Sequence, residues 1–203
     1  MSVAYRPRGA LVCSRPVAQH RHHYESAFEQ YVRRRSIPYV SVNEARRALF
    51  KETPSFHCRA GTEPRPRPLK SFDFVLYGTP TNLLVEVKGR QVTGGGGNAR
   101  ARLENWVTEQ DVESLLIWER LFGKGFRAAF AFIYWCAEPP PEPLFEEIFE
   151  FRDRWYALRG VEVAAYAREV RPRSAKWRTV HVPHAAFDRI SGPLGRISEP
   201  SCA

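Results

Sequence analysis

Apolar and polar positions alternate unevenly along residues 82 to 91, which read NLLVEVKGRQ. In a β-strand, successive side chains point to opposite faces of the sheet. One face of this segment is then entirely aliphatic, with Leu83, Val85 and Val87. The opposite face places Glu86 and Lys88 beside Leu84. The pattern predicts a buried strand with two charges aimed to the same side, which calls for a charged group or ligand facing them.

The same periodicities predict the other elements of the chain. Helices are expected over residues 22–35, 44–50, 108–122 and 162–170, with a short one ending near residue 190. Strands are expected over residues 37–42, 69–77, 82–88, 127–136, 147–151, 154–158 and 177–182. The apolar run at 127–136 is typical of a strand buried on both faces of a sheet. This order predicts an α/β fold, a mixed β-sheet flanked by helices with a C-terminal α+β extension.

Two further segments are expected to be loops. Residues 52–68 are rich in proline, and the four glycines at 94–97 predict a mobile loop. The segment RPRSAKWR at 171–178 fits either an accessory contact to nucleic acid or a solvated loop.

The turn at residues 78–81 fixes a register between two predicted strands. If Tyr77 lies opposite Asn82 in an antiparallel hairpin, Asp73 lies directly across from Glu86. Like charges facing each other across a strand pair, about 5 Å apart, repel and cost stability. Some further interaction must offset this repulsion.

A divalent cation offsets it, because Mg²⁺ is commonly held by one or two carboxylates together with water and substrate phosphate. Lys88 then lies near enough to polarise or deprotonate an attacking water, or to neutralise charge that develops on a phosphate. This trio suits metal-assisted phosphodiester hydrolysis. The alternative is an edge hairpin with one polar face, on which Asp73 and Lys88 form an ordinary ion pair.

The first predicted helix, HHYESAFEQYVRRR, supplies further carboxylates. Glu25 and Glu29 lie one turn apart on one helical face, at the border of the apolar stripe. A carboxylate at that border reaches over a sheet edge toward a metal ion. Glu29 can equally pair with Arg33, so Glu25 is the favoured candidate.

Together these residues resemble the PD-(D/E)XK nucleases of the restriction-endonuclease-like fold. That family places a glutamate on its first helix, an aspartate on its second core strand, and an E-x-K motif on its third. The positions here are Glu25, Asp73, Glu86 and Lys88. One departure is Phe72, which replaces the proline before the aspartate.

Two narrower likenesses accompany this one. The segment YESAFEQYVRRRSIPYV is similar to the opening helix and strand of archaeal Holliday-junction resolvases. Residues 23–29 also read as HYExAFE, the signature of a family of uncharacterised bacterial proteins. The nuclease likeness covers residues 22–136, and the HYExAFE likeness runs to about residue 194.

The resemblance implies a Mg²⁺-dependent endonuclease, with Mn²⁺ as a substitute, that hydrolyses nucleic acid, expected to be DNA, through a metal-activated water. Asp73, Glu86 and Glu25 are expected to hold the metal, and Lys88 to assist the water. A catalytically inactive nucleic-acid-binding module with the same fold is the alternative, since a fold does not fix an activity. A structural protein with a basic leader is a third possibility.

Five residues near this site are candidates for nucleic-acid contacts. Arg90, Arg100 and Arg102 flank the glycine run and suit a clamp on the phosphate backbone. Trp106 offers a face on which a base can stack, although packing is the commoner role for such a residue. Gln110 lies near the start of the helix after E-x-K, where it either supports the site or is merely solvated.

Composition adds a charge asymmetry to this picture. The 203 residues carry a formal net charge of +9. Residues 1–70 hold 14 Lys or Arg against 5 Asp or Glu, whereas residues 71–203 hold 17 against 17. A polyanion such as nucleic acid is the natural partner of such an excess, although a solvated basic face also accounts for it.

Length and composition predict one domain with tails. The expected parts are a basic leader at 1–20, a nuclease-like core at 21–136, an extension packed on the core at 137–192, and a tail at 193–203. No apolar stretch approaches the roughly 20 residues of a membrane span, so a cytoplasmic protein with no membrane partner is expected. The four cysteines lack CxxC spacing and are expected to be reduced thiols. Dimerisation is common among junction-cutting relatives, so a homodimer stays open.

Overall fold

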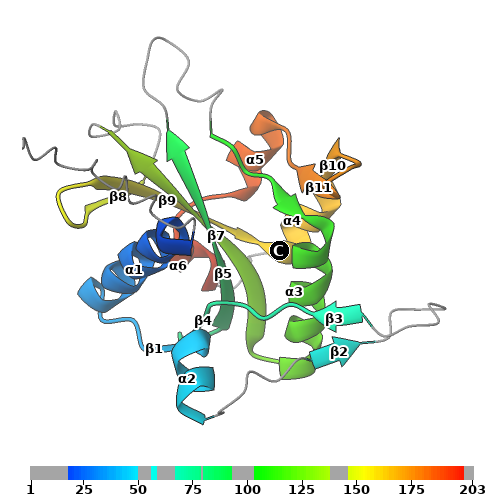
Figure 1. Ribbon diagram of the computed structural model, residues 1–203, viewed down its shortest axis with the longest axis horizontal. Helices are drawn as coiled ribbons and strands as arrows, with labels where there is room; N and C mark the ends of the chain where they lie inside the picture. The colour runs from blue at the N-terminus through cyan, green and yellow to red at the C-terminus, as the bar shows by residue number, and fades with distance from the viewer. Residues whose placement is uncertain are drawn as a thin grey trace, which may run out of the picture.

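The structure, a computed structural model, describes residues 18–49, 56–58, 67–78, 80–92, 103–137 and 146–198. A six-stranded mixed sheet forms its centre (Figure 1). In spatial order, its strands are β1 (Tyr39–Ser41), β4 (Phe74–Leu76), β5 (Asn82–Val92), β7 (Phe126–Cys136), β9 (Trp155–Glu162) and β8 (Glu147–Glu150). Only β5 and β7 pair in parallel, and they do so along their full lengths, whereas the other neighbours are antiparallel.

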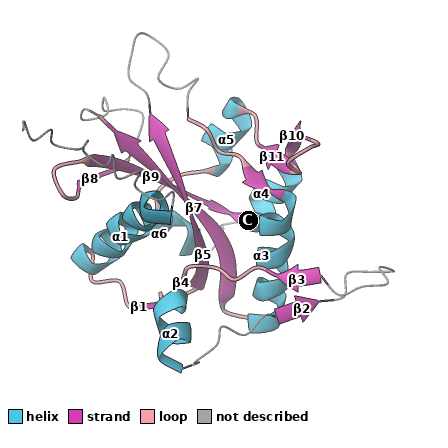
Figure 2. Ribbon diagram, viewed as in Figure 1, coloured by secondary structure: helices cyan, strands magenta, loops and turns pink. Residues whose placement is uncertain are grey.

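Helices cover both faces of this sheet (Figure 2). The face toward α3 (Glu109–Phe122) also packs against α4 (Val163–Glu169) and α5 (His184–Ile190). The other face packs against α1 (Ala18–Arg34) and α6 (Leu194–Ser198). The helix α2 (Val42–Leu49) follows β1 directly. The predicted α/β fold, a mixed sheet flanked by helices, is therefore confirmed.

Two small sheets lie outside the central one. The first is three-stranded, with β10 (Arg171–Ser174), β11 (Thr179–His181) and β6 (Val107–Thr108). The second pairs β2 (Phe56–Cys58) with β3 (Arg67–Leu69). The prediction of an uninterrupted loop over residues 52–68 was wrong at these two strands. Each of these two strands has three residues, which is too short for side-chain alternation to reveal it.

The C-terminal part of the chain builds on the same sheet. Strands β8 and β9, from the expected extension, continue the sheet beyond β7. Helix α6, which falls in the expected tail, places Leu194 in the core at 2 % exposure. Among the described residues, no helix has both the length and the apolar character needed to cross a membrane.

Helix α1 is fastened to this C-terminal part through one buried carboxylate. Phe28 and Val32 are fully buried under α1. The Tyr31 hydroxyl donates a hydrogen bond to Glu147 on β8, and the backbone N–H of Leu194 donates to the same carboxylate at 3.0 Å. A buried carboxylate is stable only when it is paired in this way. The two bonds join α1, β8 and α6.

The predicted register of the β4–β5 hairpin is confirmed, because Phe74 pairs with Val85 and Leu76 with Leu83. However, β4 has three residues and β5 has eleven. Beyond Phe74, the backbone N–H of Asp73 donates to the Val85 carbonyl at 3.0 Å, and the Asp73 carboxylate accepts from the N–H of Val87 at 2.8 Å. A side chain thus ends the strand pairing, and among the described residues β4 pairs with no residue of β5 beyond Val85.

Helix α1 lies against β5 at a glycine. A Cβ atom added to Gly89 would lie 2.1 Å from Cδ2 of Tyr24. Only a residue without a side chain therefore allows the Tyr24 ring to rest on the strand. This close approach brings the next residue of α1, Glu25, to the edge of β5.

We expect Gly89→Ala to destabilise the protein by at least about 1–3 kcal/mol, because the Tyr24 ring must move away from the strand. Urea unfolding measures the change in the free energy of unfolding. Gly195→Ala is the matched control, since a Cβ there has no heavy atom within 4 Å, and it should change stability by less than about 0.5 kcal/mol. Equal stability of the two variants would show that the contact is not tight.

Candidate active site

A cavity of about 600 Å³ lies where β5 extends beyond β4. It is bordered by the start of α1, the residues before β4, the second half of β5, and the start of α3. The carboxylates and ammonium groups that line it are Glu25, Lys70, Asp73, Glu86, Lys88 and Asp111. The structure therefore brings together all four residues that the sequence predicted for catalysis.

The predicted facing of β5 explains why two charges point into the cavity. Leu84 belongs to the core beneath α3, and Val85 to the core beneath α1. Glu86 and Lys88 share the face of Leu84, so they point toward the start of α3. There Lys88 Nζ lies 2.8 Å from Glu86 Oε1 and 3.1 Å from Oδ2 of Asp111.

The two facing carboxylates resist ionisation. Burial raises the pKa of Asp73 to about 6, with a further contribution from Glu25, against the opposing effect of the Val87 N–H and Lys88. Burial likewise raises the pKa of Glu86 to about 7, with Asp73 and Asp111 adding to it and Lys88 opposing it. The cavity thus holds carboxylates whose negative charge is only partly compensated by the protein.

Lys88 is held as an ammonium. Burial lowers the pKa of Lys88, but the carboxylates of Glu86 and Asp111 more than offset burial, and its pKa lies above the ordinary value. A lysine that acts as a base needs a lowered pKa. Of the roles predicted for Lys88, the structure favours charge stabilisation over proton abstraction.

Asp111 is a charged residue of the cavity that sequence reasoning recognised only as a helix cap. The cap exists, since the N–H of Asp111 donates to Thr108 Oγ1 at 3.1 Å and the N–H of Thr108 donates to Asp111 Oδ2 at 2.9 Å. The same carboxylate also pairs with Lys70 at 2.8 Å and with Lys88. Burial raises the pKa of Asp111, but Lys88, Lys70 and Thr108 outweigh burial and bring it to about 2.

The choice between the two glutamates of α1 follows from their surroundings. Glu29 lies outside the cavity lining, where Oε1 accepts hydrogen bonds from Arg33 and from the Tyr39 hydroxyl, each at 2.6 Å. Glu25 lines the cavity and is close enough to Asp73 to raise the pKa of that residue. Glu25 is therefore the helix carboxylate at the site.

Of the residues predicted to contact nucleic acid, some line the cavity and others do not. Arg90 and Trp106 line the cavity, but they contact each other, with the guanidinium 4.1 Å from the ring centroid and a hydrogen bond to the Trp106 carbonyl. Gln110 donates to the carbonyl of Pro68 at 2.8 Å and does not line the cavity.

Burial lowers the pKa of Arg90, which is typical of a structural cation rather than of a mobile clamp. The other two predicted contacts, Arg100 and Arg102, lie outside the described residues.

The donor set suits a cation that takes most of its ligands from elsewhere. Within the described residues, no group of three or more His, Cys, Asp or Glu side chains is arranged to hold a metal ion by itself. The Lys88 ammonium already forms an ion pair with the Glu86 carboxylate, and the N–H of Val87 already donates a hydrogen bond to one oxygen of Asp73. Two neighbouring carboxylates with raised pKa values nevertheless fit Mg²⁺, which completes its shell with water and substrate oxygens.

The raised pKa values predict how stability depends on pH. In the unfolded chain the Asp73 carboxyl ionises near pH 3.8, but in the folded protein it ionises near pH 6. Between these values the folded state binds more protons, so this group stabilises the fold at low pH and loses that contribution as the pH rises from about 4 to about 7. Asp73→Asn keeps an acceptor for the Val87 N–H without the charge.

The stability of Asp73→Asn relative to the parent protein should therefore rise across this window by up to about 3 kcal/mol. Urea unfolding between pH 4.5 and pH 8, with a chelator present, measures the difference. Glu169→Gln, on α4 and outside the cavity, should show the pH dependence of the parent. Parallel curves for the parent and Asp73→Asn would contradict the prediction.

Comparison with known proteins adds a likeness to a solved structure. No protein-family model and no curated protein sequence matches the chain, so neither the HYExAFE likeness nor any other family is assigned. A solved Holliday junction resolvase from Archaeoglobus fulgidus, Hjc, aligns over 88 % of this chain and 99 % of its own, with 15 % identity and a TM-score of 0.48.

Proposed function

We propose that this protein is a metal-dependent nuclease that hydrolyses phosphodiester bonds of nucleic acid, with DNA as the expected substrate. The observation that carries the proposal is the pair Asp73 and Glu86. Asp73, just before β4, faces Glu86 on β5; both carboxylates are partly buried with raised pKa values, and they share a cavity with the Lys88 ammonium. Such pairing costs stability, which a site for a cation explains.

Asp73 and Glu86 are the residues that would hold Mg²⁺ or Mn²⁺, and Glu25 approaches the same cavity from α1. The bound ion would neutralise these carboxylates, polarise the scissile phosphate and activate a water for attack. Lys88 stays protonated and offers its ammonium to the negative charge that develops on the phosphate oxygens. Asp111 orients Lys88 by its ion pair at 3.1 Å.

A nucleic-acid-binding module without catalysis is the second candidate. The specific observation in its favour is that Lys88 already pairs with both Glu86 and Asp111, so the cavity is partly neutralised by the protein alone. Such a module would bind nucleic acid with a steep salt dependence and leave it uncut.

Cleavage assays separate these candidates. With Mg²⁺ or Mn²⁺ and a panel of labelled DNA and RNA, the parent protein should cut at least one substrate, and a chelator should stop it. Asp73→Asn and Lys88→Ala should each reduce the rate at least about 100-fold, because the first removes a metal ligand and the second removes a positive charge that acts on the reacting phosphate. Salt-dependent binding by the parent without any cutting would favour the module.

The two glutamates of α1 provide a matched pair for the same assay. Glu25→Gln should slow cleavage about tenfold, because it removes a carboxylate from the cavity, whereas Glu29→Gln, one helical turn away, should leave the rate unchanged. Equal effects of the two substitutions would remove Glu25 from the proposed site.

Metal binding can be measured independently of cleavage, by the change that it causes in the melting temperature. A ligand that binds only the folded state stabilises it, so millimolar Mg²⁺ or Mn²⁺ should raise the melting temperature of the parent protein. The shift should be larger at pH 8 than at pH 5.5, because protons compete for Asp73 and Glu86 at the lower pH. Asp73→Asn should abolish the shift, and its persistence would place the cation elsewhere.

A further inference from the structure

A hairpin of basic and aromatic residues stands beside the cavity. Strands β10 and β11, with the turn between them, carry the segment RPRSAKWR at 171–178, which has four cations and no acid. Trp177 in the turn is 70 % exposed, and Lys176 Nζ lies 5.3 Å from its ring centroid. An aromatic ring set among cations on a protruding turn is typical of surfaces that stack nucleic-acid bases.

The base of this hairpin forms part of the cavity rim. Thr179 of β11 pairs with Thr108 of β6, and Thr108 lines the cavity. The guanidinium of Arg173 lies 4.8 Å from the ring centroid of Trp106, another lining residue, and 2.9 Å from Glu104. The hairpin is therefore fixed to the cavity through main-chain pairing and through a stacked side chain.

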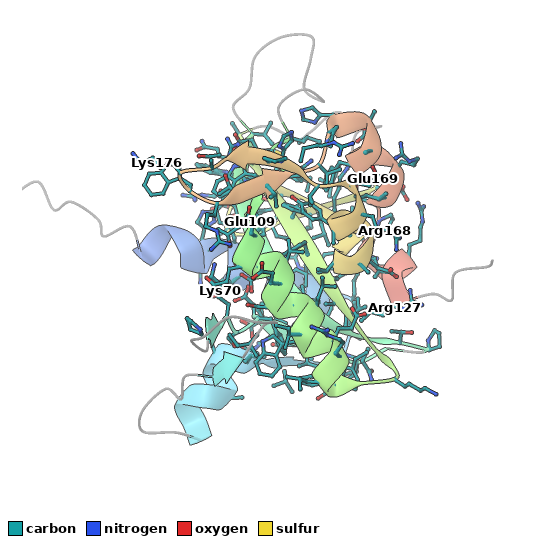
Figure 3. The ribbon with its side chains drawn as sticks, turned by 90° about the vertical axis from the view of Figure 1, so that its right-hand side faces the viewer. Lys70, Glu109, Arg127, Arg168, Glu169 and Lys176 are labelled. Atoms are coloured by element: carbon teal, nitrogen blue, oxygen red, sulfur yellow. The ribbon has the colours of Figure 1, made fainter. Side chains whose placement is uncertain are left out.

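The turn of the hairpin lies on the same side of the molecule as Lys70, one of the residues that line the cavity (Figure 3). Figure 3 shows Lys176 at the tip, with Glu109 and Lys70 below it along the same side. Lys70 lines the cavity, and Glu109 pairs with Arg178 at 2.9 Å. A strand of nucleic acid that runs along this side passes both features.

The charges of the hairpin divide into two groups. Arg173 and Arg178 pair with the carboxylates of Glu104 and Glu109 and thereby hold its base in place. Arg171 and Lys176 occupy exposed positions. Cations on an exposed edge are suited to phosphate groups, which give most of the affinity for nucleic acid.

We propose that the β10–β11 hairpin binds an unpaired stretch of nucleic-acid strand next to the cavity, with a base stacked on Trp177 and phosphates held by Arg171 and Lys176. The proposal rests on the proposed nuclease function and deepens it by naming the substrate class. The faces of bases are open in a single strand but are covered inside a continuous duplex. The substrate is therefore nucleic acid with unpaired nucleotides beside the cleavage point.

Binding is measured by the fluorescence anisotropy of labelled oligodeoxynucleotides, with the Asp73→Asn protein in chelator so that nothing is cut. The probes are a single strand, a blunt duplex, and the same duplex with a single-stranded overhang. Adding Trp177→Ala should weaken binding of the first and third probes about tenfold, and of the blunt duplex less than twofold. Trp177→Phe keeps an aromatic face and should retain most of the affinity.

Tyr77→Ala is the matched aromatic control, because Tyr77 is also exposed, at 44 %, but lies at the other end of the β4–β5 hairpin. It should leave all three affinities unchanged. The double substitution Arg171→Ala and Lys176→Ala should lower the slope of log affinity against log salt by about 1.4 for the single strand, if each cation meets one phosphate.

The outcomes separate this proposal from the nuclease proposal. If Trp177→Ala changes no affinity, or weakens the blunt duplex as much as the overhang, the hairpin proposal is overturned even where cleavage depends on Asp73. If the Trp177 effect is present and the parent protein cuts nothing with any metal, the hairpin proposal stands and the nuclease proposal fails.

Discussion

The candidate site depends on the unequal lengths of two neighbouring strands. β4 begins only at Phe74, which pairs with Val85, whereas the antiparallel β5 continues beyond Val85 to Val92. At the point where they part, the carboxylate of Asp73 accepts the hydrogen bond from Val87 that a further β4 residue would otherwise have taken. This one hydrogen bond satisfies the N–H group of Val87 and ends the pairing of β4 with β5. It also holds the Asp73 side chain opposite Glu86.

The arrangement of charges at the site lowers the stability of the folded protein. Asp73 and Glu86 lie partly buried near each other, and this burial raises the pKa of both. Lys88 reduces the cost only in part, because its ammonium is shared between Glu86 and Asp111, the capping residue of α3. Destabilised charges of this kind cluster at functional sites, where a ligand supplies the missing compensation.

Much of this arrangement could be predicted from the sequence because it follows from local rules. Alternation placed Glu86 and Lys88 on one face, and a tight turn fixed Asp73 opposite Glu86. The second role of Asp111 was missed, since its bond to Lys88 joins residues far apart in the chain and its cap motif already explained it. The strand β10 was missed because its pairing with β11 is too short to leave a pattern. Arg90 proved half-buried against Trp106, a contact that no periodicity encodes.

The bonds of Glu147 have a consequence for how the chain can be divided. This carboxylate on β8 joins Tyr31 of α1 to the backbone of Leu194. The helix that carries Glu25 is therefore held in place by residues more than a hundred positions later. A shortened protein that ends after β7 retains every residue of the E-x-K motif but loses this contact of its first helix, so the folded unit that positions Glu25 includes β8 and α6.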